Sequence, residues 1–315
     1  MAKKKDAKTK KKGASLSAGV AVKDRPKASA SKAEKKSASK KRKKAKKKQP
    51  KFTAATADKQ ILYQLSVQSP EEDVKFLRRV YKSFRRKPAR HLREDFCGTG
   101  LLAAEWIKKG AEFTAEGFDI CEDTVAWGIE HNFEPLGTDA SRCKLHIKDV
   151  REPSHRAPDV RVGLNFSYHI FKQREEMVNY FRLAHADLAD DGIFVLDIHG
   201  GPDAMIENEE EREIDEGFTY IWDQEAYWPA TGDYLCHIHF EFEDGTRMNK
   251  AFTYEWRLWT LPEIVDCLKD AGFEGEIASY WEGTAEDGES GDGNFRRRRK
   301  GENCDSWIAY IVAAK

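Results

Sequence analysis

The sequence predicts an α/β fold with a mostly parallel sheet, helices on both faces and an antiparallel β add-on after the fifth strand. Short apolar segments that end in a polar or acidic residue alternate with helical segments between residues 90 and 197. A Gly-x-Gly turn follows the first strand, and aromatic residues recur with strand-like alternation within 218–256. The Lys-rich start lacks the large apolar residues that a core needs, so we expect it to be disordered.

The segment 90–107 is the centre of this prediction. A short buried strand leads into the turn 97–100 and then into a helix. Gly98 and Gly100 lack a Cβ, so a ligand can lie against the backbone there. The helix adds unpaired N–H groups and the positive end of its dipole. An ordinary strand–helix connection is the alternative when the turn is considered alone.

Polar residues also close the later strands. Asp119 ends the second strand about 25 residues after the first, a spacing that suits a carboxylate that binds a ribose diol. Asp149 follows the third strand, and Asn165 and Asp197 end the fourth and fifth. The ligand edge of such a sheet lies at the carboxyl ends of its strands, so we expect these side chains in a common cleft.

From residue 63 to residue 315 the chain resembles the class I S-adenosylmethionine-dependent methyltransferases. The turn 97–100 matches the second half of that family's glycine motif, and Glu94 stands where the family has its acidic residue. The segment 256–273 resembles the region before the sixth strand of small-molecule methyltransferases. The resemblance implies a Rossmann-like sheet of seven strands and S-adenosylmethionine as the cofactor.

The resemblance also assigns residues to that cofactor. It implies that Asp119 binds the ribose and that Asp149 and Val150 flank the adenine. Phe96 departs from the family, which usually has a glycine there, so the backbone is expected to approach the cofactor less freely. The implied cofactor-binding residues are Glu94, Asp95, Phe96, Cys97, Gly98, Gly100, Asp119, Ile120, Asp149, Val150 and Asn165.

The predicted catalytic residues are Asn165, Tyr168 and His199. The segment 165–168 lies where nucleic-acid and amine N-methyltransferases often carry Asn/Asp-Pro-Pro-Tyr, with both prolines replaced here. The Asn165 carbonyl can accept a hydrogen bond from an amine, and Tyr168 can stack on a planar acceptor or a cation. His199 is a candidate base or substrate contact. A packing role for Asn165 and a polar-rim role for His199 are the alternatives.

Segments outside the sheet supply the predicted substrate contacts. A helix within 57–68 is expected to cover the cofactor and to offer Tyr63 and Gln68, although Tyr63 can equally pack on the sheet. Three antiparallel strands within 217–257 are expected to cross the cofactor mouth. Their aromatic residues, Trp256 among them, either wall an acceptor pocket or form a small satellite core. The acidic residues 203–216 predict a solvent-exposed helix.

Two cationic segments point to anionic partners. Residues 1–51 hold 22 Lys or Arg and three acids, which leaves 32 basic and 51 acidic residues for 52–315. Such a tail can bind the phosphates of nucleic acid or another polyanion without sequence specificity, or it can act as a solubilising or self-association arm. The arginines at 296–299 lie in a predicted loop that either binds an anion or is simply solvated.

Composition argues against several classes of protein. No apolar run is long enough to span a membrane, and the basic start lacks the apolar stretch of a secretory signal. The six cysteines show no metal-ligand spacing, so we expect reduced thiols and no metal. These features favour a cytoplasmic protein, with a nuclear location possible in a eukaryotic cell.

Together these observations predict a disordered tail at 1–51 and, at 52–315, a methyltransferase domain that acts on a small molecule. An RNA or DNA methyltransferase that uses the tail is one alternative, although the acidic balance of 52–315 opposes it. A cofactor-binding scaffold without catalytic activity is the other. The resemblance requires no metal, because a sulfonium methyl group is already activated.

Overall fold

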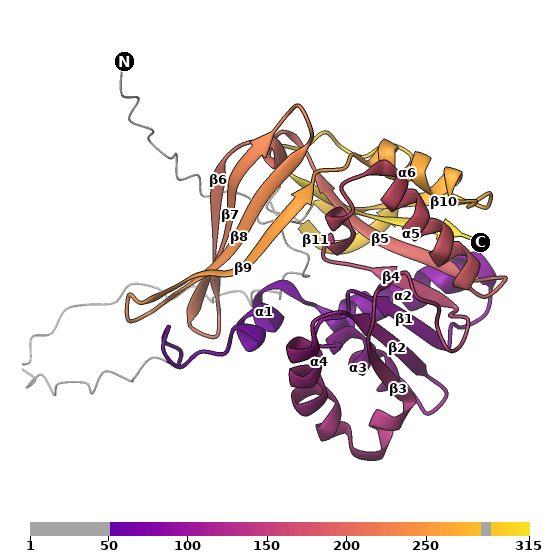
Figure 1. Cartoon of the computed structure of the whole chain (residues 1–315), viewed down its shortest axis with the longest axis horizontal. Coiled ribbons are helices and arrows are strands. Elements are labelled where there is room, and N and C mark those ends of the chain that lie inside the picture. Colours follow the sequence, from indigo (N-terminus) through magenta and orange to yellow (C-terminus); the bar gives the residue numbers. More distant parts are fainter. Residues whose placement is uncertain (1–50, 285–290) are drawn as a thin grey trace, which may run out of the picture.

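Two β-sheets organise the structure, a computed structural model that describes residues 51–284 and 291–315. Figure 1 shows the larger sheet with its helices, and the smaller sheet projecting beyond one of its edges. The predicted Lys-rich tail falls on residues that lie outside the described part of the chain, apart from Lys51. None of the helices in the described part is both long enough and apolar enough to cross a membrane.

The large sheet has eight strands in the order β11-β10-β12-β5-β4-β1-β2-β3. The first five strands are parallel: β1 (His91–Asp95), β2 (Thr114–Asp119), β3 (Cys143–Ile147), β4 (Val160–Gly163) and β5 (Ile193–Gly200). β12 (Trp307–Ala314) is antiparallel to β5, and β10 (Ile277–Thr284) is antiparallel to β12. β1 lies between β2 and β4, where the strand order reverses, so the ligand crevice is expected at its carboxyl end.

Helices cover both faces of this sheet, as predicted. α2 (Pro70–Arg85) and α3 (Leu101–Ile107) share one core with the inner side chains of the strands. α5 (Arg174–Asp187) and α6 (Leu261–Asp270) share the other. α6 begins with a capping box, in which Thr260 and Glu263 each accept the other's backbone N–H. α4 (Glu122–Gly128) continues into the π-helix η1 (Ile129–Phe133) and the 3₁₀ segment η2 (Glu134–Arg142).

The small sheet is antiparallel and has four strands, where the sequence analysis expected three. They are β6 (Asn208–Ile214), β7 (Phe218–Trp228), β8 (Asp233–Phe242) and β9 (Arg247–Arg257). The expected helix at 203–216 is wrong: only the short 3₁₀ turn η4 (Pro202–Met205) is helical, and residues 208–214 pair along β7. An edge strand can carry many charges because one of its sides faces solvent, so acidic composition did not indicate a helix.

The arginine-rich segment is also different from the prediction. Residues 291–297 form β11 (Gly291–Arg297), which pairs with β10 and adds the eighth strand. Arg296 forms an ion pair with Asp292 at 2.7 Å, and Arg297 pairs with Glu276. These two arginines therefore already have acidic partners on the strand edge.

α1 (Lys59–Val67) joins the two sheets, and Figure 1 shows it between the small sheet and the parallel strands. Leu62 is fully buried in the core of the small sheet. The Gln64 amide donates to the Thr99 hydroxyl in the glycine turn at 2.8 Å. Trp127 donates its indole N–H to Asp58 at 2.8 Å. The helix predicted at 57–68 is thus confirmed, and it lies over the turn.

Candidate active site

The turn after β1 has the backbone of a glycine motif even where the residue is not glycine. Phe96, Gly98 and Gly100 have φ values of 53°, 53° and 66°, all in the left-handed region. Phe96 therefore adopts the conformation that glycine adopts easily, and its ring contacts Phe171 and Tyr180 on the α5 side of the sheet. The aromatic side chain is accommodated because it lies on that side.

The glycines leave space for a ligand at one position and allow close packing at others. A Cβ on Gly98 would have only the Thr124 methyl group near it, at 3.8 Å, so its surface is open. A Cβ on Gly128 would lie 2.2 Å from the Thr99 carbonyl oxygen, so this glycine lets the end of α4 approach the turn. Close packing against α4 therefore fixes the turn, whereas its surface at Gly98 is accessible. A ligand could lie against the backbone there.

Asp119 at the end of β2 is attached to this turn. Its two oxygens accept the N–H groups of Gly98 and Cys121, each at 2.8 Å. The adjacent Ile120 is largely exposed, at 73%. Each carboxylate oxygen has a further lone pair, so Asp119 can still accept a hydrogen bond from a ligand.

The residues after β3 are fixed by charged groups. The Arg151 side chain donates two hydrogen bonds to Asp149, at 2.8 and 2.6 Å, and its backbone N–H donates a third at 2.8 Å. These bonds lower the pKa of Asp149. Val150 is buried, and its carbonyl accepts hydrogen bonds from Arg93 and Arg161 at 2.7 and 2.6 Å. The loop predicted to flank an adenine is therefore anchored to the sheet beneath it.

The Asp95 carboxylate takes part in that anchor rather than in the cleft. It accepts hydrogen bonds from Arg93 at 2.8 Å, from Arg161 at 2.7 Å and from the Tyr180 hydroxyl at 2.8 Å. All four side chains are buried on the α5 side of β1 and β4. The predicted contact of Asp95 with a cofactor is thus restricted to its backbone.

An acidic pocket, as we call it, lies at the carboxyl ends of β1, β4 and β5. Burial raises the pKa of Glu94 to about 8, and it raises the pKa values of Asp73 and Asp197 to about 7 each. The buried side-chain oxygen of Gln68 has no hydrogen-bond partner among the described residues. Three carboxyl groups with raised pKa values and an acceptor without a partner suit a cationic group. The pocket is lined by Gln68, Pro70, Asp73, Glu94, Leu102, Leu164, Asn165, Asp197 and Tyr310.

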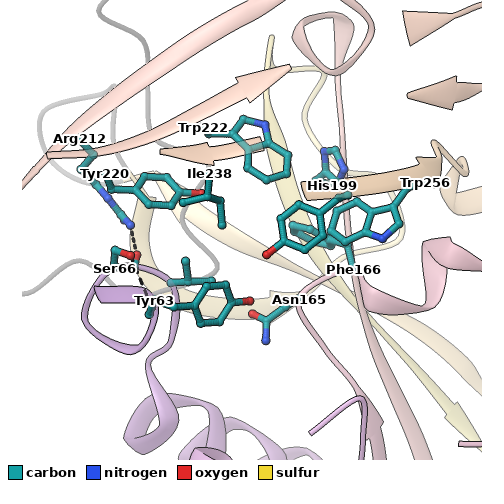
Figure 2. Close-up of a pocket in the computed structure, with 12 residues that line it drawn as sticks. Tyr63, Ser66, Asn165, Phe166, His199, Arg212, Tyr220, Trp222, Ile238 and Trp256 are labelled. Atoms are coloured by element: carbon teal, nitrogen blue, oxygen red, sulfur yellow. Dashed lines mark hydrogen bonds between the residues drawn. The ribbon is translucent and has the colours of Figure 1, made fainter. Parts of the chain in front are cut away.

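A second pocket, the aromatic pocket, lies between α1, the inner face of the small sheet and the loop after β4 (Figure 2). Rings from α1, β7 and β9 surround it, and Arg212 from β6 is the one charged residue among the described residues that line it, His199 being treated as neutral. It is lined by Tyr63, Ser66, Val67, Asn165, Phe166, His199, Arg212, Tyr220, Trp222, Ile238, Tyr254 and Trp256.

Asn165 lines both pockets and therefore marks their junction. Asn165 and Phe166 both have φ of 57°, which is an uncommon conformation for two consecutive residues other than glycine. Asp197 stabilises it by accepting their backbone N–H groups at 2.7 and 3.0 Å. Strain of this kind persists only where its surroundings hold it, and it is concentrated at functional sites.

The other two predicted catalytic residues have different positions. His199 lines the aromatic pocket and shares a 2.9 Å hydrogen bond with the Tyr234 hydroxyl. Burial lowers the pKa of His199 to about 4, so the ring is neutral at pH 7 and is a weak base. Tyr168 is fully buried in the core on the α5 side, where its hydroxyl donates to the Asp197 carbonyl at 2.8 Å. The predicted stacking of Tyr168 on an acceptor is therefore wrong.

The predicted substrate contacts are divided between the pockets. Tyr63 and Trp256 line the aromatic pocket, and Gln68 lines the acidic pocket. Two charged lining residues were missed: Asp73 lies in α2, and Arg212 lies in the segment misread as a helix. A strand assignment at 208–214 would have placed Arg212 on the same face as its partner Tyr220.

One cluster elsewhere has the composition of a metal site. The ligand atoms of Glu116, His146 and His155 lie within 4.8 Å of one another. Burial would raise the pKa of Glu116, but hydrogen bonds from His91 and from the backbone N–H groups of His155 and Arg156 lower it to about 2. Both carboxylate oxygens accept hydrogen bonds, and through them the cluster fastens the loop after β3 to the sheet.

No family model matches the sequence, and no curated protein does so either. Solved structures do share its fold. An S-adenosylmethionine-dependent methyltransferase from Clostridium acetobutylicum ATCC 824 is 17% identical with a TM-score of 0.55, over 82% of this chain and 93% of that chain. The CcbJ methyltransferase from Streptomyces caelestis is 15% identical with a TM-score of 0.57, over 78% and 95%. The fold is that of the class I methyltransferases.

A third similar structure is the sugar N-methyltransferase KedS8 from Streptoalloteichus sp ATCC 53650. It is 16% identical with a TM-score of 0.54, over 89% of this chain and 99% of that chain. The similarity thus extends over most of each methyltransferase chain. The matched part of this chain is larger than its parallel sheet, so the similarity is not confined to that sheet.

Proposed function

We propose that this protein is an S-adenosylmethionine-dependent methyltransferase that acts on a small molecule. One observation carries the proposal: an acidic pocket beside a glycine turn and an aromatic pocket beneath the small sheet meet at Asn165. A methyl donor in the first pocket and an acceptor in the second would face each other across that residue. Transfer between two bound molecules requires such adjacency, because the reacting atoms must approach in line.

The residues of the cleft fit the parts of this cofactor. The open surface of Gly98 and the oxygens of Asp119 suit a nucleoside with a ribose diol. Asp149, Val150 and Ile120 are the proposed neighbours of the base. Gln68 and the carboxyl groups of Glu94 and Asp73 suit the ammonium and sulfonium charges of the methionine part.

When bound, S-adenosylmethionine would supply a methyl group on a positively charged sulfur. The acceptor's lone pair would form the new bond to carbon, and the sulfur would keep the electrons of the broken bond as a neutral thioether. The chain's own residues would then orient the acceptor and exclude water. Asn165 is placed to accept a hydrogen bond from an acceptor N–H or O–H at the junction of the two pockets. α1 and the small sheet close the aromatic pocket from solvent on two sides.

The walls of the aromatic pocket favour a small acceptor over a nucleic acid. The wall residues come from α1, from β5 and the four strands of the small sheet, and from the loop after β4. Seven of them carry rings: Tyr63, Phe166, His199, Tyr220, Trp222, Tyr254 and Trp256. The similar structures include a sugar N-methyltransferase. The nucleic-acid alternative rests on the tail at 1–51, most of which lies outside the described residues, and its test is the salt dependence of RNA and DNA binding with and without that tail.

Incubation of the full-length protein with methyl-labelled S-adenosylmethionine and fractionated cell extract tests the proposal. We expect label in the small-molecule fraction. Label confined to RNA, DNA or protein would replace the proposal with another acceptor class. No transfer to any fraction, despite measurable cofactor binding, would favour the scaffold alternative.

A further inference from the structure

The aromatic pocket contains a half-buried cation that lacks a counter-ion among the described residues. Arg212 enters it from the edge strand β6, and its guanidinium lies over the Tyr220 ring at 5.3 Å. Its Nη2 donates to the Ser66 carbonyl, as Figure 2 shows, which fixes the direction of the side chain. Burial lowers the pKa of Arg212, yet a guanidinium stays charged at neutral pH.

The Arg212 charge is not neutralised by the described part of the chain. The ion pairs among residues 51–284 and 291–315 do not include it, and its Nε is buried without a hydrogen-bond partner. A partly desolvated charge without a partner is destabilising, and a buried donor without an acceptor adds to that cost. A ligand that brings an anionic group would remove both costs, with an oxygen on Nε as its natural position.

The other part of the pocket has a different chemistry. Figure 2 places Arg212 at one end, beside Ser66 and Tyr220, and places Phe166, His199 and Trp256 together at the other, with Asn165 beside Tyr63. Aromatic ring faces attract an ammonium group, and the Asn165 side chain can accept a hydrogen bond from an amine. Just beyond Asn165 lies the acidic pocket, whose carboxyl groups disfavour an anionic group at this end of the aromatic pocket.

Resting on the methyltransferase function proposed above, we propose that the acceptor is a small amine that also carries a carboxylate, bound with the carboxylate on Arg212 and the amine at Asn165. An amino acid is the simplest molecule of this kind. Its ammonium form releases one proton to water before transfer, and the free nitrogen lone pair then forms the N–CH₃ bond. Arg212 would make the site specific for a carboxylate, because an amine that lacks a carboxylate leaves the guanidinium unpaired.

The test uses matched probes that differ only in the carboxylate. The full-length protein with methyl-labelled cofactor is offered a panel of amino acids, and beside each one the amine that lacks its carboxyl group. We expect at least one amino acid to be methylated with a kcat/KM roughly 10- to 100-fold above that of its partner amine, the range expected of a charge-assisted hydrogen bond. Methylation of the amines at equal or higher kcat/KM, or of no amino acid, overturns the inference.

Variants of Arg212 provide the second arm. Arg212→Met is expected to abolish the preference for the acid mainly through KM, and Arg212→Lys is expected to restore part of it. Arg182→Met, which changes an exposed arginine on α5, is the matched control. Cofactor affinity and thermal unfolding are measured for each variant. A retained preference in a folded Arg212→Met protein overturns the inference, whereas absent cofactor binding in the wild type would instead refute the proposed function.

Discussion

The carboxylate of Asp197 on β5 accepts the backbone N–H of Asn165 at 2.7 Å. This bond fixes the backbone of the residue that lines both pockets. The other carboxylate oxygen accepts the N–H of Phe166 at 3.0 Å. Two consecutive residues with positive φ are therefore stabilised by one buried side chain. The orientation of Asn165 depends on this carboxylate.

Asp197→Asn is the variant that tests this dependence. An amide has one acceptor oxygen, so one backbone N–H loses its partner and faces an NH₂ group. We expect a loss of about 1–3 kcal/mol in the free energy of unfolding, and a larger fall in kcat than in cofactor affinity. Asp190→Asn, an exposed aspartate before β5, is the control. Unchanged stability and turnover in Asp197→Asn would show that Asn165 and Phe166 keep their conformation without this carboxylate.

The buried carboxyl of Glu94 predicts a pH dependence of stability. Burial raises its pKa from the usual 4.5 to about 8, so the folded protein keeps a proton that the unfolded chain releases. This stabilisation is complete below about pH 4.5 and is lost as pH rises towards 8, by at most about 1.4 kcal/mol per pH unit. Urea unfolding of the cofactor-free protein at pH 5.5, 6.5, 7.5 and 8.5 measures it.

Glu94→Gln isolates this group from Asp73 and Asp197, whose pKa values are also raised, to about 7. Glutamine cannot ionise, and its carbonyl can still accept the Ala103 N–H that Glu94 accepts at 3.0 Å. We expect a shallower fall of stability with pH in the variant. An identical slope in the two proteins would mean that Glu94 titrates normally.

The buried cluster beneath the loop after β3 predicts a large difference between a buried and an exposed ion pair. Arg161 and Asp95 are joined at 2.7 Å with exposed side-chain fractions of 1% and 0%. Arg161→Met leaves the Asp95 charge without one of its two guanidinium partners, so we expect a loss of about 3–5 kcal/mol. Lys148→Met breaks the exposed pair with Glu152 and should cost about 1 kcal/mol or less. Chemical denaturation decides between these outcomes, and similar losses would contradict the account.

Substitutions at two glycines distinguish a role in packing from a role in ligand access. In Gly128→Ala the new Cβ would lie 2.2 Å from the Thr99 carbonyl, so α4 must move and we expect a loss of about 2–4 kcal/mol. In Gly98→Ala the methyl group meets no close atom, and the positive φ costs about 1–2 kcal/mol. Cofactor affinity should nevertheless fall in Gly98→Ala. The explanation fails if Gly128→Ala is as stable as the wild type.

Local chemistry made much of the fold predictable. The turn at 97–100 and the Thr260–Glu263 capping box are determined by a few neighbouring residues, and both are present in the structure. Side-chain direction was less predictable, because it depends on what packs behind a strand. Tyr168 lies in the core and Asp95 bonds to two arginines, although each belongs to a sequence segment that predicted a position in the cleft.

The small sheet shows a second reason for error. Five of the seven residues of β6 are charged, so composition suggested a solvated helix, whereas pairing with β7 determines the strand. That error removed Arg212 from the candidate residues. The aromatic members of the same sheet were recognisable because alternation places Trp222 and Trp256 on strands whichever face they occupy.

The central claim is that the cleft at Gly98 and Asp119 binds a sulfonium nucleoside. Isothermal titration of the full-length protein with S-adenosylmethionine, and separately with its demethylated product, tests it most directly, with Gly98→Ala as the comparison. We predict one site per chain with micromolar or tighter affinity for both, weakened in the variant. No heat with either compound, or equal affinity in wild type and variant, would contradict the account.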